Sequence, residues 1–285
     1  MKKYLVDLTV KCVQQVNGTC VLLVMTDDKP LPLCKPGQFA ELRIDDTQGI
    51  ILRRPISIHY LDVEKNEIGF LVQVVGEGTK WLASVKEGDK VNTLFPLGNC
   101  FGIDDDKSKK LLLVGGGVGC APLYYLGAEL KKAGYDFTIL IGARKKEDLY
   151  RRAEFEALGR VEYTTEDASL GEKGFVTNHS VLNEKFDKIY TCGPKPMMMA
   201  VAAYAKQNNI TCEVSLENKM ACGLGACLCC VEDTKEGHRC VCTDGPVFPK
   251  KSVTQIWLNV PNPVSPNKIL NLFSLKLESV TAVSV

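Results

Sequence analysis

The sequence has almost no net charge. Its 285 residues include 35 Lys and Arg against 34 Asp and Glu, which leaves a formal charge of +1 at pH 7. Proteins that bind nucleic acid or anionic membrane surfaces carry a local or global excess of positive charge. The composition therefore favours a small ligand or a protein as the partner, and we expect neither nucleic acid nor a membrane.

The sequence also lacks a long uninterrupted apolar run. Its most apolar window, residues 111–130, contains five glycines and Pro122, a pattern typical of a strand, a tight turn and a helix. Near the start, Asp7 and Lys11 interrupt the apolar residues before they could form the core of a signal peptide. We expect no transmembrane segment and a cytoplasmic location.

Histidine is scarce, whereas cysteine is abundant. The chain has three histidines and 13 cysteines, and six of the cysteines fall between Cys222 and Cys242. A Rieske centre needs two histidine ligands, and only His238 lies near these cysteines. In a reducing compartment, clustered thiols more often hold a metal than form disulfides, so the sequence predicts a thiolate metal site.

The spacing of the cysteines indicates the kind of metal. Cys222, Cys227 and Cys230 follow the C-x4-C-x2-C pattern of plant-type [2Fe-2S] proteins. Gly223 and Gly225 let the loop wrap closely and direct its amide groups at sulfur. The spacing leaves the fourth ligand open between Cys240 and Cys242 and does not fully exclude Cys229. Structural zinc, which takes four thiolates in paired hooks, is the alternative.

The order of strand-like and helix-like segments along the chain predicts an α+β multi-domain protein. Short β-like runs separated by Gly and Pro fill residues 1–104, which predicts an N-terminal antiparallel β-barrel. Strands and helices alternate in residues 105–217, which predicts a central α/β domain with a parallel sheet. Residues 218–250 form a small cysteine-rich module, and we assign no role to the tail, 251–285.

Two glycine-containing turns predict a nucleotide site in the central domain. An apolar strand runs into Gly115, Gly116, Gly117 and Gly119 and then into a helix, where amide groups and the helix dipole favour a pyrophosphate. The third position of the G-x-G-x-x-G fingerprint holds Cys120, so this turn alone is ambiguous. A second turn, residues 192–194, also follows a buried strand and opens a helix. Both turns should lie at the carboxyl edge of the sheet.

The first 104 residues contain two further anion-binding features. Residues 53–57 combine a guanidinium suited to phosphate, a proline of fixed φ and a hydroxyl that can bond a ring nitrogen. Residues 76–79 read Gly-Glu-Gly-Thr and predict an anion-holding turn. Taken alone, each feature is a weak signal, and an ordinary β-hairpin with a surface arginine is the simpler interpretation.

Together these segments resemble the ferredoxin-reductase-like flavoproteins, in particular the electron transfer subunits of NAD-dependent, class B dihydroorotate dehydrogenases. The similarity covers roughly residues 1–250 in consistent order. It rests on these motifs: Arg54-Pro55-Ile56-Ser57, Gly76-Glu77-Gly78-Thr79, Gly115-Gly116-Gly117-Val118-Gly119, Cys192-Gly193-Pro194-Lys195-Pro196-Met197, Met220 to Cys227, and Cys242 to Phe248.

The resemblance implies a set of cofactor sites. The barrel would hold FAD, with Ser57 near the reactive flavin nitrogen and Gly78 and Thr79 at its phosphates; the central domain would hold NAD, and Cys242 would be the fourth cluster ligand. The implied FAD residues are Arg54, Pro55, Ile56, Ser57, Leu71, Val72, Gln73, Gly78 and Thr79. The implied NAD residues are Gly115, Gly116, Gly117, Gly119, Cys192, Gly193 and Pro194. The implied cluster ligands are Cys222, Cys227, Cys230 and Cys242.

The resemblance also implies a function. Nicotinamide carries two electrons as hydride and an iron-sulfur cluster carries one, so a flavin must stand between them. Electrons would pass from a catalytic FMN-containing subunit through [2Fe-2S] and FAD to NAD+ in pyrimidine biosynthesis, in a heterotetramer with two chains of each kind. This chain would have no catalytic residue for dihydroorotate.

Three alternatives stay open at this point. Arg144-Lys145-Lys146 follows the second predicted strand of the parallel sheet and could attract the 2′-phosphate of NADP. The chain could instead be a subunit of a ferredoxin:NADP or sulfide-type reductase, which shares the cofactor layout. From another class, it could be a zinc-stabilised binding module without redox activity.

Overall fold

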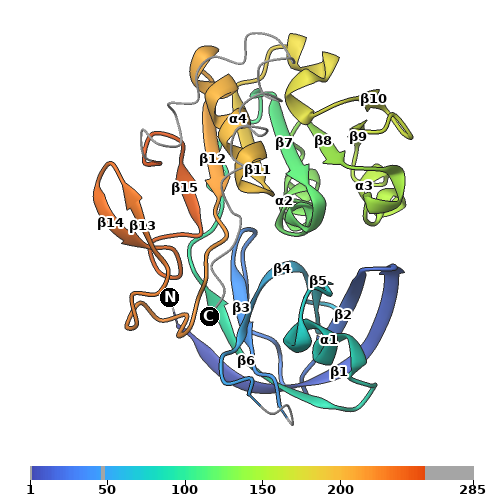
Figure 1. Ribbon diagram of the computed structural model, residues 1–285, viewed down its shortest axis with the longest axis vertical. Coiled ribbons are helices and arrows are strands. Elements are labelled where there is room, and N and C mark those ends of the chain that lie inside the picture. Colours follow the sequence, from blue (N-terminus) through green and yellow to red (C-terminus); the bar gives the residue numbers. More distant parts are fainter. Residues whose placement is uncertain (1, 46–48, 254–285) are drawn as a thin grey trace, which may run out of the picture.

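The computed structural model describes residues 2–45 and 49–253, so most of the predicted tail lies outside the described residues. Three parts are visible in Figure 1: a barrel below, an α/β layer above, and a small hairpin-containing module beside both. The predicted α+β organisation is confirmed. Among the described residues, no helix is long and apolar enough to cross a membrane.

The N-terminal part is a closed barrel of antiparallel strands in the order β1-β2-β5-β4-β3-β6, as predicted. Its strands are β1 (Tyr4–Asn17), β2 (Cys20–Thr26), β3 (Phe39–Leu42), β4 (Arg54–Asp62), β5 (Glu67–Gln73) and β6 (Lys90–Leu97). Alternate residues point inward, and Leu8, Ile58 and Phe70 are fully buried there. One helix, α1 (Glu77–Ser84), follows β5.

The central part is built on a mainly parallel sheet in the order β10-β9-β8-β7-β11-β12-β15. The strands are β7 (Leu111–Gly116), β8 (Phe137–Ala143), β9 (Arg160–Thr165), β10 (Glu172–Lys173), β11 (Lys188–Cys192), β12 (Thr211–Ser215) and β15 (Val247–Pro249). The last strand is antiparallel to β12 and comes from the predicted cysteine-rich segment. The C-terminal module therefore completes the edge of the nucleotide-domain sheet.

Helices cover both faces of this sheet. They are α2 (Cys120–Ala133), α3 (Arg152–Glu156) and α4 (Lys195–Gln207), with short 3-10 turns η1 (Gly117–Gly119), η2 (Lys146–Asp148), η3 (Val176–Asn178) and η4 (Ser180–Asn183). The apolar side of α4 packs with Leu112 and Val114, and that of α2 packs with Leu111 and Leu113. Because neighbouring strand residues face opposite ways, the two helices lie on opposite faces.

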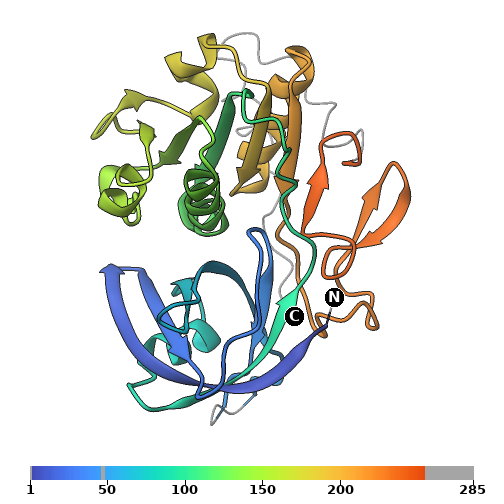
Figure 2. The ribbon, with the colours of Figure 1, turned by 180° about the vertical axis from the view of Figure 1, so that it is seen from behind.

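The C-terminal module is a cysteine-containing loop followed by a hairpin of β13 (Val231–Thr234) and β14 (Gly237–Cys240). Seen from behind, the segment that leaves β6 passes close to this module before it enters β7 (Figure 2). The C-terminal module therefore contacts both the barrel, through Gly223 against Glu41, and the sheet, through β15 paired with β12.

Candidate functional site

A cavity of about 330 Å³ lies where the three parts meet. That volume is within the range of small-ligand pockets. Its walls come from β3, β4, β5 and α1 of the barrel, from the start of α2, and from the segment after β12. The lining residues are Phe39, Arg54, Pro55, Ile56, Ser57, Leu71, Gln73, Val75, Thr79, Val118, Ala121, Ser215, Leu216, Glu217, Asn218, Met220 and Pro246.

Most residues predicted to hold FAD are brought together here. Seven of the nine line the cavity: Arg54, Pro55, Ile56, Ser57, Leu71, Gln73 and Thr79. The side chain of Val72 points the other way, into the barrel core, because alternate residues of β5 face opposite sides. Gly78 does not line the cavity, but it adjoins Arg54.

Gly78 makes room for the Arg54 guanidinium. A Cβ at position 78 would lie 2.6 Å from Arg54 Nε, so only glycine lets the side chain rest on the start of α1. The predicted anion-holding turn is thus the first turn of a helix. Backbone N–H groups and the positive end of the dipole at such a terminus attract anions, and the nearby guanidinium adds a full positive charge suited to phosphate.

Thr79 shapes the same helix start. Its hydroxyl oxygen Oγ1 accepts hydrogen bonds from the backbone N–H groups of Val75 (2.9 Å) and Gly76 (3.0 Å). It also donates to the carbonyl of Gly76 at 2.9 Å. The side chain therefore fixes the turn that precedes α1, and the fit to a phosphate-bearing ligand comes from the backbone that it holds.

Several wall residues were not predicted from the sequence. Phe39 lies opposite Ser57 in the pairing of β3 with β4. Val118 and Ala121 come from the glycine turn and the first turn of α2, and residues 215–218 directly follow β12. Residues 215–218 could have been predicted from the sequence, because they lie at the carboxyl end of a strand of the parallel sheet, where such sheets bind ligands.

The two predicted nucleotide turns lie side by side at the carboxyl edge of the sheet. Gly115 on β7 pairs with Cys192 on β11. A Cβ at Gly119 would lie 2.4 Å from the Cα of Gly193, so the two backbones touch. Most of these glycines are buried, and Gly117 is partly exposed at the start of α2, where a pyrophosphate could approach the backbone N–H groups. The basic run Arg144-Lys145-Lys146 follows β8 and is exposed.

The predicted cluster ligands lie in the loop before β13 and just after β14. Backbone N–H groups of this loop point at sulfur: Leu224 donates to Cys222 Sγ at 3.3 Å, and Cys242 donates to Cys230 Sγ at 3.4 Å. Gly223 and Gly225 have φ of +64° and +82°, the left-handed region that the loop requires. This matches the geometry expected of a loop wrapped around thiolates.

Thiol acidity differs across the loop. The N–H groups of Leu224 and Cys227 lower the pKa of Cys222 to about 6, because they stabilise its thiolate. Burial and the adjacent Cys230 raise the pKa of Cys242 to about 12. Cys222 thus becomes a thiolate at a lower pH than Cys242 does, and metal binding would draw the proton from Cys242.

The four predicted ligands form two pairs. Cys222 lies within hydrogen-bonding reach of Cys227, and Cys242 within reach of Cys230. Among residues 2–45 and 49–253, no three His, Cys, Asp or Glu side chains converge on one point as ligands of a single ion would. Cys240 also lies within reach of Cys230. A [2Fe-2S] centre takes two thiolates on each of two irons, and the pairs Cys222–Cys227 and Cys230–Cys242 fit that requirement.

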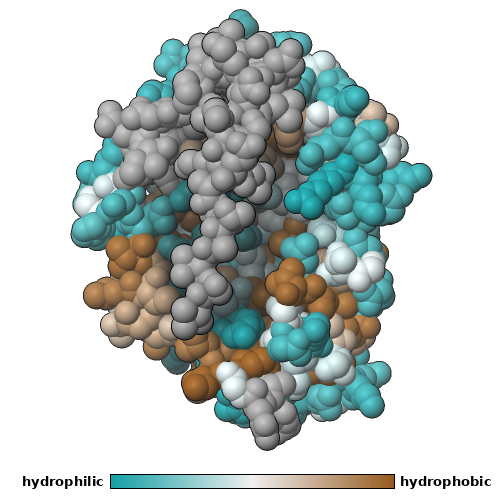
Figure 3. All heavy atoms as spheres, in the orientation of Figure 1, coloured by the Kyte–Doolittle hydropathy of each residue, from teal (hydrophilic) through white to brown (hydrophobic). Residues whose placement is uncertain are grey.

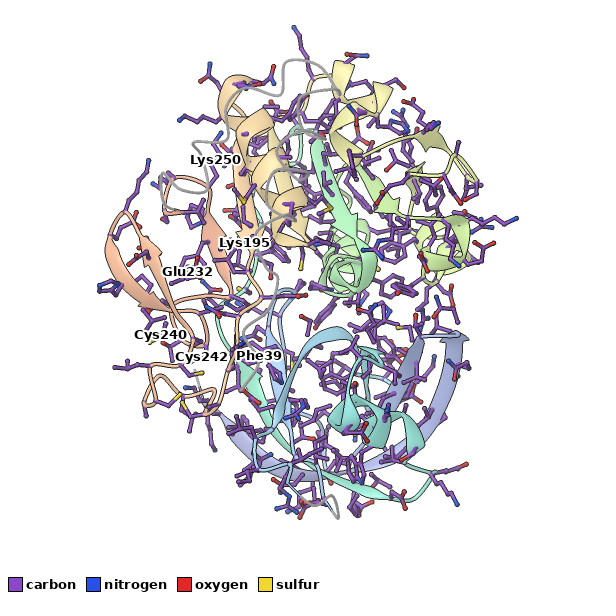
Figure 4. All side chains as sticks on the ribbon, viewed as in Figure 1. Phe39, Lys195, Glu232, Cys240, Cys242 and Lys250 are labelled. Atoms are coloured by element: carbon purple, nitrogen blue, oxygen red, sulfur yellow. The ribbon has the colours of Figure 1, made fainter. Side chains whose placement is uncertain are left out.

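The cavity and the cysteine pairs share a wall. Phe39, Leu216 and Met220 line the cavity and also belong to the apolar cluster that contains the buried Cys230 and Cys242. In the view of Figure 4, Phe39 and Cys242 are labelled at the junction of the barrel and the C-terminal module. Both sites therefore border one continuous apolar cluster.

A larger groove, about 1520 Å³, lies between the barrel and α2. Its lining mixes aliphatic and aromatic side chains, such as Leu22, Val24 and Tyr60, with charged residues. Most of those charged residues pair with one another, as in Lys11–Glu67, Lys65–Asp62 and Lys132–Glu129. None of the predicted site residues lines it. Because its charges are already paired, we consider the smaller cavity the better candidate despite its size.

Comparison with known proteins identifies two families. Residues 113–203 match the oxidoreductase NAD-binding domain, and residues 217–254 match the iron-sulfur cluster binding domain of dihydroorotate dehydrogenase B. Among solved structures, the NADH-dependent reduced ferredoxin-NADP oxidoreductase superposes with a TM-score of 0.79 and 29% identity, over 95% of this chain and 99% of that one. The ferredoxin reductase of carbazole 1,9a-dioxygenase shares the fold, with a TM-score of 0.60 and 20% identity, over 73% of this chain and 65% of that one.

Curated relatives agree along almost the whole described chain. The dihydroorotate dehydrogenase B (NAD(+)) electron transfer subunit of Shouchella clausii is 38% identical over 87% of this chain and 98% of its own length. That of Caldanaerobacter subterraneus is 44% identical over 75% of this chain and 84% of its own. The chain therefore belongs to the family of dihydroorotate dehydrogenase B electron transfer subunits, as the sequence motifs predicted.

Proposed function

We propose that this chain relays electrons in the cytoplasm from a catalytic dihydroorotate dehydrogenase subunit to NAD+, in the synthesis of pyrimidines. One observation carries the proposal: the cavity lined by the predicted flavin residues and the buried cysteine pair border the same apolar cluster, to which Phe39, Leu216 and Met220 belong. Two redox sites in contact through packed side chains can exchange electrons without any moving part. A binding module without redox activity would have no need of this contact.

The barrel side of the cavity suits FAD. Arg54 and the first turn of α1 would hold the pyrophosphate, and Ser57 would hydrogen-bond the ring system against β4. Pro55, Ile56, Leu71 and Gln73 would supply the remaining wall, with Thr79 fixing the phosphate turn. Gly78 would contribute by leaving space for the guanidinium, and Val72 through its backbone alone.

The glycine turns would hold NAD on the opposite side of the cavity. Gly115, Gly116, Gly117 and Gly119 precede α2, whose N-terminus would face the nucleotide phosphates. The turn at residues 192–194 would flank the nicotinamide portion. Val118 and Ala121 line the flavin cavity from this same segment, so the two ligands would meet there.

Cys222, Cys227, Cys230 and Cys242 would hold the [2Fe-2S] cluster, two thiolates to each iron. The N–H groups that already point at Cys222 and Cys230 would stabilise the negative charge of the cluster. Bound FAD supplies the conversion between the two-electron chemistry of nicotinamide and the one-electron chemistry of the cluster. The chain itself orders the three sites and keeps water from the wall between them.

The cysteine loop would also meet the catalytic subunit. Leu224 and Leu228 are 47% and 63% exposed beside it, and Figure 3 shows an apolar area on this side of the molecule. An apolar surface around a redox centre fits a protein partner. We propose that the partner carries FMN and the groups that act on dihydroorotate, and that two chains of each kind assemble.

An anaerobic visible spectrum of the purified chain, with iron, zinc and flavin analysis, tests this function. We expect flavin bands over an iron-sulfur background, about two irons per chain, and bleaching on addition of NADH. Dihydroorotate alone should leave the spectrum unchanged, because this chain would lack a residue acting on it. A strong preference for NADPH would favour a ferredoxin:NADP-type reductase, and a colourless zinc protein would refute the relay.

A further inference from the structure

His59 lies at the contact between the barrel and the nucleotide domain. The side chain is fully buried, and its Nδ1 lies 2.9 Å from the carbonyl oxygen of Ala121 in the first turn of α2. A carbonyl only accepts hydrogen bonds, so Nδ1 must carry the proton and donate. The ring also stacks on Tyr124, with centroids 4.6 Å apart.

A local irregularity of β4 directs this side chain outward. Ile58 pairs with Phe70 and Tyr60 pairs with Gly69, so His59 is the extra residue of a β-bulge. Tyr60 also faces outward, over Gly69, where any Cβ would lie 2.2 Å from its ring. Bulges often re-aim a side chain beside a functional site. Here the bulge places an imidazole between two domains.

Keeping histidine at this position is costly. The other ring nitrogen, Nε2, is buried without a hydrogen-bond partner. Burial and the nearby Arg151 lower the pKa of His59 to about 3, so the ring is neutral and Nε2 is an unsatisfied acceptor. Such a group carries a desolvation penalty that an apolar side chain would avoid. A function of the Nδ1–H bond would account for a histidine, rather than an apolar side chain, at this buried position.

The two ends of that bond belong to the two ligand sites. His59 is two residues after Ser57 on the strand that lines the flavin cavity, and Ala121 lines the same cavity directly after the glycine turn. Within residues 2–45 and 49–253, a second hydrogen bond joins α2 to the barrel part, from Tyr125 to the carbonyl of Cys34 at 2.8 Å, and it does not involve β4. His59 is thus the polar link between the flavin strand and the nucleotide turn.

We propose that His59 is a positioning residue, whose Nδ1–H bond to Ala121 sets the distance between the nicotinamide nucleotide bound at the start of α2 and the flavin held by β4. The inference rests on the proposed function. Hydride passes only when donor and acceptor are about 3–3.5 Å apart, and a displacement of about 1 Å can slow transfer on the order of 100-fold. A hydrogen bond that holds β4 and the start of α2 at a fixed separation would meet that requirement.

Side-chain geometry allows a discriminating test on the full chain loaded with FAD and cluster. The amide nitrogen of His59→Asn takes the position of Nδ1 and can still donate to Ala121, whereas that of His59→Gln takes the position of Nε2. His59→Leu removes the donor. Tyr125→Phe is the matched control, because it removes a hydrogen bond at the same interface without touching β4.

Anaerobic rapid mixing with NADH gives the limiting rate of flavin reduction and the dissociation constant of NADH. The absorbance of the stacked nicotinamide and flavin rings gives a reading independent of turnover. We expect His59→Gln and His59→Leu to lower the limiting rate about 10- to 100-fold and to weaken the ring-stacking absorbance, with little change in NADH affinity or FAD content. His59→Asn and Tyr125→Phe should stay close to the unchanged chain.

Two results would overturn the proposal: a normal rate and normal stacking absorbance in His59→Gln, or a loss in His59→Asn equal to that in His59→Leu. If His59→Leu does not fold, the Asn and Gln variants still decide. An unaltered chain that binds no FAD, or whose flavin NADH does not reduce, would instead refute the proposed function.

Discussion

Glu41 carries a buried carboxyl group that makes no hydrogen bond. It is fully buried on β3, and neither carboxylate oxygen has a hydrogen-bond partner. A Cβ at Gly223 of the cysteine loop would lie 2.9 Å from its Cγ, so the carboxyl sits directly beneath that loop. Burial raises its pKa from 4.5 to about 7, with Arg53 opposing the shift and Cys222 adding to it.

The raised pKa predicts a pH-dependent stability. The folded chain holds the Glu41 proton more tightly than the unfolded chain does, so this contribution is complete below pH 4.5 and is lost as pH rises to about 7. Glu41→Gln should therefore raise the free energy of unfolding at pH 8 by on the order of 2–3 kcal/mol and change it little at pH 4.5. Denaturant unfolding at both pH values measures this.

The exposed Glu64 provides the control for that experiment. Glu64→Gln should leave the pH dependence as it is, because an exposed carboxyl loses no hydration on folding. A Glu41→Gln chain that is less stable at pH 8 than the unaltered chain would contradict the prediction. It would mean that attraction to Arg53 outweighs the cost of burial.

Two cysteines compete for the role of fourth cluster ligand, and burial distinguishes them. Both lie within reach of Cys230, but Cys242 is 1% exposed whereas Cys240 is half-buried on β14. We expect Cys242→Ala to lose most of its iron and Cys240→Ala to keep about two irons per chain. Iron analysis and the electron paramagnetic resonance of the reduced protein measure the difference. The reverse pattern would make Cys240 the ligand.

At the scale of elements, the nucleotide edge depends on the contact between two glycine turns. Because Gly119 and Gly193 touch through their backbones, even a methyl group at position 119 must push the turns apart. Gly119→Ala should weaken NADH binding at least about 10-fold, since the amide groups that would meet the pyrophosphate move. Titration of the flavin-loaded chain with NADH measures this effect.

Gly159→Ala is the matched control for that substitution. A Cβ at Gly159 would meet nothing closer than 3.9 Å, so the same chemical change should leave NADH affinity and flavin content unaltered. If Gly119→Ala binds NADH normally, the first glycine turn does not hold the nucleotide.

At the scale of the whole molecule, Asn99 ties the three parts together. It lies between β6 of the barrel and β7 of the sheet. Its side chain forms hydrogen bonds with residues between β14 and the start of β15. Its amide nitrogen donates to the carbonyls of Asp244 (2.9 Å) and Val247 (2.8 Å), and its Oδ1 accepts from the N–H of Val247 (2.9 Å). The cluster module is thereby fastened to both larger domains.

Loss of this fastening should loosen the cluster. Asn99→Ala removes three side-chain hydrogen bonds, for which we expect a loss of about 2–3 kcal/mol in stability. We also expect faster removal of iron by a chelator, with NADH reduction of the flavin retained. Asn208→Ala, at the exposed end of α4, should change neither property. Unchanged iron release in Asn99→Ala would show that the module holds its cluster without the larger domains.

The sequence by itself determined those features that depend on local order. The cysteine spacing, the glycine turns after apolar strands and the change from short strands to alternating strands and helices each lie within a few residues. They were enough to predict the barrel, the parallel sheet and the family. Seven of nine predicted flavin residues line the cavity for the same reason, because they come from two short motifs and one strand.

Tertiary structure alone decided which distant segments meet. Phe39 and Cys242 belong to one apolar cluster, His59 reaches Ala121, Glu41 lies beneath Gly223, and Asn99 holds the segment that follows Cys242. The register of β3 against β4, the bulge in β4 and the docking of α2 on the barrel set these contacts. Spacing along a chain carries no information about such registers, because they follow from packing between elements far apart in sequence.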